Sequence, residues 1–155
     1  MISITGVFPA ALGAILGTAC AIVQTPAAPS TEGQPAASWN VTLQLSGGFV
    51  GLDRELRIAS TGELSAMDRR RKTTTIRRAG AAQIAELSAL ISKLSERAGT
   101  PAAPTDCRDC VRYRLQLQTG SRTINAELDD VNVAGTELES LIGALTALLN
   151  ESLAG

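Results

Sequence analysis

Apolar and polar positions alternate along several short segments of the chain, and in two other segments the apolar positions recur at helical spacing. The alternating pattern predicts strands at residues 39–45, 50–58, 63–67, 72–76, 111–117 and 124–128. The helical spacing predicts one helix within residues 81–97 and a second that ends near residue 149. Thr136 and Glu139 fit a capping box at the start of this second helix.

The connections within each group of predicted strands are short, which favours antiparallel pairing because parallel neighbours need long crossover connections. Each predicted helix has one apolar stripe, so it must pack against the sheet. We therefore expect an α+β domain, with an antiparallel sheet of about six strands and two helices on one face. The chain has 155 residues, which suits one such domain, and we place it at residues 39–152.

The N-terminal segment differs in composition from the rest. Its first 23 residues carry no charged side chain and hold an apolar core, as in a secretory signal. We assign residues 1–20 to a signal peptide and the Pro/Ala-rich residues 21–38 to a disordered tether. Cys20 ends a segment similar to a bacterial lipobox and is a candidate for lipidation.

Export follows from this interpretation, to the periplasm, to the medium or to a lipid-anchored position at the cell envelope. An uncleaved signal that stays in the membrane is the alternative, since the stretch is near spanning length. We expect membrane contact only through the lipid on Cys20 or through that uncleaved signal. The oligomeric state is left open, because the Leu-rich C-terminal helix suits either core packing or a dimer seam.

Composition narrows the function. The chain contains no histidine, which excludes His-dependent catalytic triads, His general bases and the imidazole zinc sites of most metalloenzymes. We therefore expect a protein that is not an enzyme, with no catalytic residue, no metal and no cofactor. The net charge of −1 gives no overall attraction to nucleic acid, and we expect none as a partner.

Six basic residues nevertheless lie within residues 69–78. Stacking aromatics are missing beside them, so this run is interpreted as a solvated edge that discourages aggregation rather than as a nucleic-acid site. Attraction to an acidic protein surface or to anionic lipid is the alternative, which the salt dependence of binding would distinguish.

Cys107 and Cys110 form a CxxC unit. In an exported chain this spacing favours a local disulfide that closes the loop before the strand at residues 111–117. A redox-active pair is the alternative, but such pairs open a helix after a strand, whereas this one precedes a strand. Two thiolates without histidine do not complete an ordinary structural zinc site.

The stretch Ser-Gly-Gly-Phe-Val-Gly at residues 46–51 is the candidate binding site. We expect Gly47 and Gly48 to be the two loop residues of a type I′ hairpin, because both positions need positive φ. This register pairs Leu43 with Leu52 and puts Phe49 on the face opposite the apolar one. Phe49 is then either folded back over an edge or covered by a helix, or it is an exposed aromatic anchor. Gly51 would leave room for a partner's backbone.

Ser46, Gly47, Gly48, Phe49 and Gly51, with an alternating strand before them and a Leu-rich helix and Tyr-Arg-Leu-Gln-Leu after them, resemble the emfourin family. The similarity spans roughly residues 39–150. The N-terminal export segment and the Cys107/Cys110 pair depart from the family pattern.

The resemblance implies a non-catalytic protein inhibitor of thermolysin-like metalloproteases that blocks the active-site cleft reversibly. These enzymes favour a bulky apolar side chain just after the cleaved bond, and Phe49 is of that type. On this hypothesis residues 46–49 enter the cleft, with Phe49 in the apolar pocket. The alternative from another class is an exported envelope lipoprotein or a structural protein-binding module that inhibits no protease.

Overall fold

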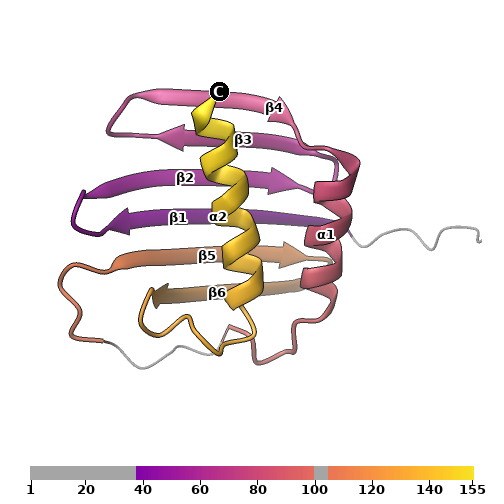
Figure 1. Cartoon of the computed structure of the whole chain (residues 1–155). Helices are drawn as coiled ribbons and strands as arrows, with labels where there is room; N and C mark the ends of the chain where they lie inside the picture. Colours follow the sequence, from indigo (N-terminus) through magenta and orange to yellow (C-terminus); the bar gives the residue numbers. More distant parts are fainter. Residues whose placement is uncertain (1–37, 100–104) are drawn as a thin grey trace, which may run out of the picture. The chain divides into compact units, whose positions relative to one another are not determined.

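Six strands form one antiparallel sheet in the computed structural model, which describes residues 38–99 and 105–155. The strands are β1 (Trp39–Gly47), β2 (Leu52–Ala59), β3 (Glu63–Asp68), β4 (Thr73–Arg78), β5 (Val111–Thr119) and β6 (Arg122–Asp129). Their order across the sheet is β4-β3-β2-β1-β5-β6, so the first strand is central and pairs with both β2 and β5 (Figure 1). The predictions for residues 1–20, for Cys20 and for the tether up to residue 37 lie outside the described residues.

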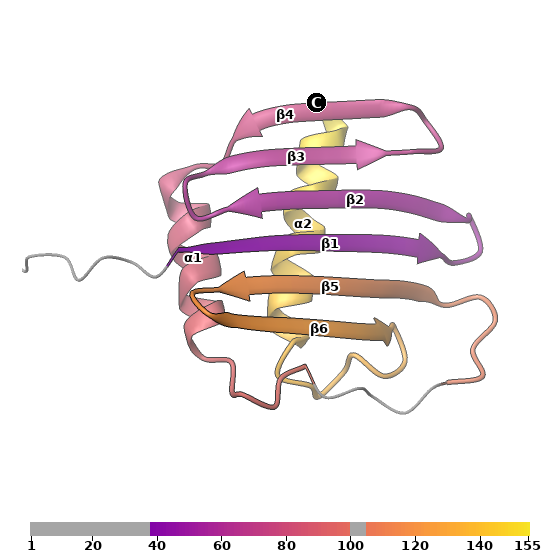
Figure 2. The same ribbon diagram turned by 180° about the vertical axis from the view of Figure 1, so that it is seen from behind.

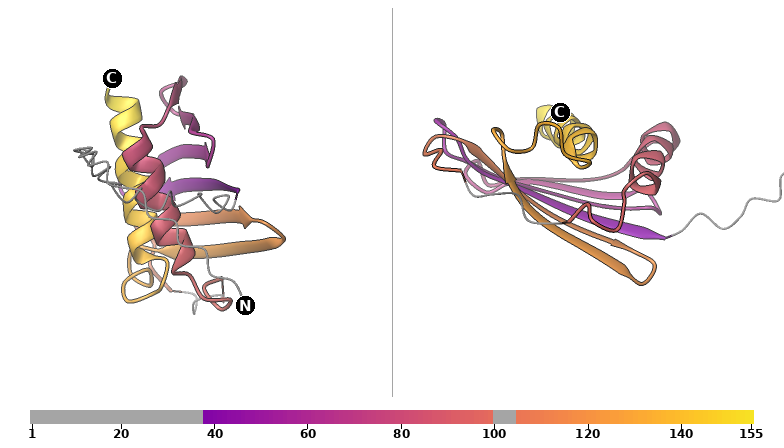
Figure 3. Two further views of the ribbon diagram at one scale, coloured as in Figure 1. Left: turned by 90° about the vertical axis from the view of Figure 1, so that its right-hand side faces the viewer. Right: turned by 90° about the horizontal axis from the view of Figure 1, so that it is seen from below.

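Two helices cover one face of this sheet. Helix α1 (Ala81–Ser92) connects β4 to β5, and helix α2 (Glu139–Ala154) follows β6. Figure 3 shows both helices on the same face, and Figure 2 shows the opposite face open along all six strands. The expected α+β class, with six antiparallel strands and two helices on one face, is confirmed.

The core lies between this face and both helices, since Leu87 and Ile91 of α1 join it as well as the buried residues of α2. It is built from aliphatic side chains because the whole chain is only 3% aromatic. Side chains that point alternately to the two faces put the apolar positions of each strand under the helices. The largest side chains with almost no exposed surface are those of Val41, Leu43, Leu56, Leu115, Leu117, Leu138, Leu141, Leu145 and Leu149.

The register of the β1–β2 hairpin differs from the predicted one. Gly47 pairs with Leu52, and the connection is the four-residue turn 48–51 rather than a two-residue Gly47–Gly48 loop. Leu43 lies opposite Leu56, not Leu52. The predicted pairing would have set Arg54 opposite Val41, in the middle of the apolar face. The observed register instead moves Arg54 toward the end of the sheet, where charge is tolerated.

The C-terminal end of α1 and the N-terminal end of α2 also differ from the predictions. Helix α1 ends at Ser92, short of residue 97, because the following chain is held by side chains from other elements. Glu137 accepts hydrogen bonds from Ser95 N and Ser95 Oγ, both at 2.8 Å, and Arg122 Nη1 donates to the Leu94 carbonyl at 3.1 Å.

The predicted capping box of α2 is not formed. Thr136 Oγ1 donates to the Val133 carbonyl, and Glu139 Oε2 accepts from Gly135 N at 2.8 Å. The N-cap residue is Leu138, whose side chain is buried. Packing of Leu138 in the core therefore sets the start of this helix, in place of local capping chemistry.

Arginines at the β4 side of the sheet attach α2. Arg54 Nη1 donates to Asn150 Oδ1 at 2.9 Å, and Arg54 Nε pairs with Asp68 Oδ2 at 3.0 Å. Arg77 Nε donates to Ser152 Oγ at 3.1 Å, and its Nη2 pairs with Glu151 at 3.2 Å. The helix thus has an apolar contact at the centre of the sheet and polar contacts near its C-terminal end.

Helix α1 is joined to β1 by a hydrogen bond from Trp39 Nε1 to Ser88 Oγ, at 2.9 Å. Trp39 is buried, so Ser88→Ala leaves an indole N–H without a partner and lowers the free energy of unfolding by about 1–3 kcal/mol. Urea denaturation measures this cost. In a Trp39→Phe background, which lacks the donor, the same Ser88→Ala change should cost close to nothing. Equal costs in both backgrounds would contradict a role for this hydrogen bond.

Candidate partner-binding site

The four residues of the β1–β2 turn, Gly48, Phe49, Val50 and Gly51, form an exposed apolar point that we call the tip. Gly51 N donates to the Gly48 carbonyl at 2.9 Å, which closes a β-turn with Phe49 and Val50 at its centre. The side chain of Phe49 is 94% exposed and that of Val50 is 66% exposed. Neither helix covers them, because both turns of the β1–β2 and β3–β4 hairpins lie at the end of the sheet away from α1 (Figure 1).

The tip is held from the β5 side by close backbone contact. Gly48 N donates to the Cys110 carbonyl at 3.0 Å. Gly47 has φ 85° and Gly48 has φ 70°, and a Cβ at Gly47 would lie 2.9 Å from the Cys110 carbonyl oxygen. Glycine is therefore required at Gly47 both for its backbone conformation and for this close approach.

Cys110 is itself held by the predicted disulfide with Cys107, whose Cα atoms are 5.6 Å apart. The disulfide prediction is confirmed. It closes a short loop whose last residue supplies the carbonyl that binds Gly48. The CxxC unit thus contributes to the candidate site by positioning a backbone acceptor.

Arg70 holds the tip from the β3–β4 side. Its Nη1 donates to the carbonyl oxygen of Gly51 at 2.7 Å and to that of Val50. A Cβ at Gly51 would lie 2.7 Å from the same Nη1 atom. The space beside Gly51, which the sequence interpretation reserved for a partner's backbone, is therefore filled by an arginine of the same chain.

Arg69, Arg70, Arg71 and Lys72 form the β3–β4 connection, which we call the basic turn. Asp68 Oδ1 accepts a hydrogen bond from Arg71 N at 3.0 Å, and Asp68 Oδ2 pairs with Arg54. The bond from Arg71 N, together with the charge and hydrogen bond of Arg54, lowers the pKa of Asp68 below its usual 3.8. Asp68 therefore keeps its charge and fixes the turn at neutral pH.

Arg69 extends from the basic turn over the open face of the sheet. It donates to Asp53 Oδ1 at 3.1 Å and to Glu55 Oε2 at 2.5 Å. Glu55 also pairs with Arg57 and accepts from Gln44, and its side chain is only 4% exposed although it lies on the uncovered face. The hydrogen bond with Asp53 and the charge of Glu55 raise the pKa of Arg69. The guanidinium group of Arg69 is thus bound to carboxylates of the sheet.

Within the described residues, Cys107, Cys110 and Asp130 form a group whose potential ligand atoms lie within 4.8 Å of one another. Both sulfur atoms are used in the disulfide, so they do not offer the thiolates that a soft metal ion requires. Asp130 Oδ2 accepts from Val111 N at 3.3 Å, which adds to the support of the start of β5.

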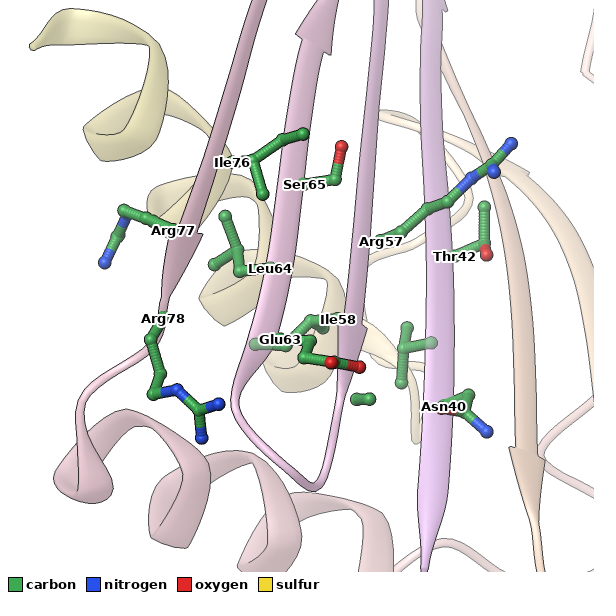
Figure 4. Close-up of a pocket in the computed structure, with 12 residues that line it drawn as sticks. Asn40, Thr42, Arg57, Ile58, Glu63, Leu64, Ser65, Ile76, Arg77 and Arg78 are labelled. Atoms are coloured by element: carbon green, nitrogen blue, oxygen red, sulfur yellow. The ribbon is translucent and has the colours of Figure 1, made fainter.

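A shallow pocket of about 510 Å³ lies on the open face, over β1 to β4. Figure 4 shows residues that line it. Two of its arginines are engaged within the chain, because Arg57 pairs with Glu55 and Arg78 donates to the Thr61 carbonyl. Its other side chains on this face are mainly short and polar, such as Asn40, Thr42 and Ser65. The pocket offers few converging groups that would fix a ligand, so the tip is the better candidate site.

Each residue that the sequence placed in the site can now be located. Gly48, Phe49 and Gly51 are in the tip, Gly47 is the last residue of β1, and Ser46 is exposed opposite Arg112 of β5. Sequence reasoning missed the two residues that hold the tip, Arg70 and Cys110. The β1–β2 and β3–β4 turns of an antiparallel meander lie at the same end, and this rule would have placed Arg70 near the glycines.

Comparison with known proteins assigns no family to the chain: neither a protein-family model nor a curated protein matches it. The resemblance to emfourin therefore stays a prediction from the residues themselves. Within residues 38–99 and 105–155, neither helix combines the length and the apolar character needed to cross a bilayer.

Replacing Cys107 and Cys110 together by serine should release the tip without unfolding the sheet. The Cys110 carbonyl is then held less firmly, and the Gly48 amide should exchange with deuterium about ten times faster, which corresponds to about 1.4 kcal/mol. Hydrogen exchange followed by NMR measures this rate. Amides in the centre of β1 serve as the control and should be unchanged. An unchanged rate at Gly48 would show that the disulfide does not support the tip.

Acid should weaken the support of the basic turn. Because the pKa of folded Asp68 lies below its unfolded value, the stability it contributes is present above that unfolded value and is lost as pH falls through the folded pKa. Asp68→Asn should therefore unfold more easily than wild type at about pH 7, and the gap should close below about pH 4. Urea denaturation across this range tests the prediction, and a gap that stays constant with pH would contradict it.

Proposed function

We propose that this protein is a non-catalytic inhibitor of thermolysin-like metalloproteases, which occludes the active-site cleft reversibly with its tip. The observation that carries the proposal is the exposure of Phe49 on a turn that hydrogen bonds hold on both sides. An exposed aromatic ring at a fixed position has the character of an interface hot spot. The residue type fits the preference that the emfourin resemblance implies for the target enzymes.

A rigid tip favours affinity because little conformational freedom is lost on binding. The turn is closed by the hydrogen bond between Gly51 N and the Gly48 carbonyl, and its base is held by the Cys110 carbonyl and by Arg70. Phe49 and Val50 are the only large apolar side chains at this turn, so the binding free energy would come from one or two anchors.

The same hydrogen bonds bear on why an inhibitor would survive in a protease cleft. Enzymes that prefer an apolar residue after the cleaved bond would attack the bond between Gly48 and Phe49. The carbonyl of that bond already accepts from Gly51 N, and the N–H of Gly48 donates to Cys110. The tip is a closed turn rather than the extended strand that a protease cleft binds and cleaves, so Phe49 can fill a pocket while the bond stays out of reach.

An inhibition assay with thermolysin and a small peptide substrate tests the proposal. Wild-type protein should inhibit, and Phe49→Ala should weaken inhibition about thirtyfold, which corresponds to the loss of a hot spot of about 2 kcal/mol. Ile76→Ala is the matched control, because Ile76 is 81% exposed but lies on β4 away from the tip. Mass spectrometry should find the chain intact after incubation.

Two outcomes would contradict the proposal. Equal inhibition by wild type and Phe49→Ala would remove Phe49 from the contact. Absence of inhibition by wild type would remove the inhibitor class and would leave the alternative, an exported lipoprotein or structural module that binds another protein.

A further inference from the structure

The tip lies between two surfaces of different charge. On its β3–β4 side the basic turn contributes four cations, Arg69 to Lys72. On its other side lie β5 and β6, because Gly47 of β1 pairs with Val111 of β5, and Arg112 of β5 pairs with Asp129 of β6. Exposed carboxylates outnumber exposed arginines there, since Asp106, Asp109 and Asp130 stand against Arg108 and Arg112. The end of the sheet that carries the tip is therefore positive on the β3–β4 side and negative on the β5–β6 side.

Two of the four cations in the basic turn are available to a partner. Arg69 is bound to Asp53 and Glu55, and Arg70 is bound to the tip carbonyls. The side chain of Arg71 is 72% exposed, and its contact with Asp68 is a long one, at 3.9 Å, to a carboxylate that Arg54 already neutralises. Within the described part of the chain, the exposed Lys72 side chain has no hydrogen bond or ion pair.

Lys72 is also held in an unfavourable backbone conformation. Its φ is 55°, and it is the one residue other than glycine with positive φ in the described ranges. Glycine or asparagine would adopt this conformation at lower cost. A lysine at this position thus costs stability while placing a charge at the end of the sheet that carries the tip, and strained backbone of this kind is commonly kept where it serves a function.

We propose that Arg71 and Lys72 are the second half of the binding surface, and that they pair with carboxylates on the rim of the apolar pocket that receives Phe49. This inference rests on the proposed function and adds the chemistry of the partner, a protease whose cleft is acidic on the side that meets β3 and β4. Because both cations are solvated at the rim, they speed association more than they slow dissociation. Phe49, at the centre, controls dissociation.

A protein partner suits this surface better than an anionic membrane. A lipid surface is uniformly negative, so it would attract the basic turn and repel Asp106, Asp109 and Asp130 on the other side of the tip. One phenylalanine and one valine also bury too little apolar area to hold a chain at a bilayer without a further signal. A pocket with carboxylates along one side matches both the apolar tip and the asymmetric charge.

Surface plasmon resonance with immobilised thermolysin, at low and high ionic strength, tests the inference. Arg71→Glu combined with Lys72→Glu should slow association about tenfold at low salt and leave the dissociation rate close to that of wild type. The difference should vanish near 1 M salt, where the Debye length is about 3 Å. Lys93→Glu is the charge control for Lys72→Glu, because Lys93 caps α1 at the other end of the sheet.

The Lys72→Gly variant distinguishes a loss of binding from a loss of folding. It removes the strain at φ 55° and should raise the midpoint of thermal unfolding, yet it should slow association about twofold to threefold at low salt. A variant that is more stable and binds more slowly has lost a contact rather than its fold.

The outcomes separate this inference from the proposed function. Binding that depends on Phe49 but not on Arg71 and Lys72 would overturn the inference and keep the inhibitor proposal. No binding by wild type would overturn both. Sedimentation with phosphatidylglycerol vesicles that is lost in Arg71→Glu/Lys72→Glu would also overturn it, because the basic turn would then recognise lipid headgroups.

Discussion

The ion pair between Arg54 and Asp68 fixes the register of β2 at the tip end of the sheet. Arg54 has the parity of the core residues in β2, so it can face the helices only where a carboxylate and the polar end of α2 meet it. This requirement sets Leu56 and Ile58 opposite Leu43 and Val41 in the core. The connection that remains is four residues long, and it carries Phe49 beyond the cover of either helix.

The same carboxylate links the two turns. Asp68 accepts from Arg71 N and so shapes the basic turn, and the basic turn in turn places Arg70 against the carbonyls of Val50 and Gly51. On the other side, the disulfide-bonded Cys110 holds Gly48. An apolar point on a small domain would otherwise be mobile. Here two connections, one to Cys110 before β5 and one to Arg70 in the basic turn, hold it on both sides, which is the condition for selective binding.

Most of the fold could be predicted from the sequence, because alternating apolar residues and short turns leave few arrangements for six strands and two helices. The register of the β1–β2 hairpin could not, since a Gly-Gly pair indicates a two-residue turn and only the partner strand β3 shows where Arg54 is tolerated. Local patterns also misplaced the ends of both helices. Those ends depend on Arg122 and Glu137 contacts with residues 94 and 95 and on the burial of Leu138.

The candidate site was predicted as a set of residues, but its support was not. The sequence left the exposure of Phe49 open, and the structure shows it exposed. The free sides of the neighbouring glycines face Cys110, Val111 and Arg70 of the same chain rather than a partner. The basic run was interpreted as a solvated edge, whereas Arg69 contacts the open face of the sheet and Arg70 contacts the tip. These contacts join segments that are distant in sequence, so the pattern of residues along the chain does not reveal them.

The most direct measurement is a crystal structure of the complex with a thermolysin-like protease. The account predicts the Phe49 ring enclosed in the apolar pocket of the cleft, an uncleaved Gly48–Phe49 bond and enzyme carboxylates facing the β3–β4 connection. A complex in which the Phe49 ring stays in solvent and the enzyme contacts another face of the sheet would contradict it.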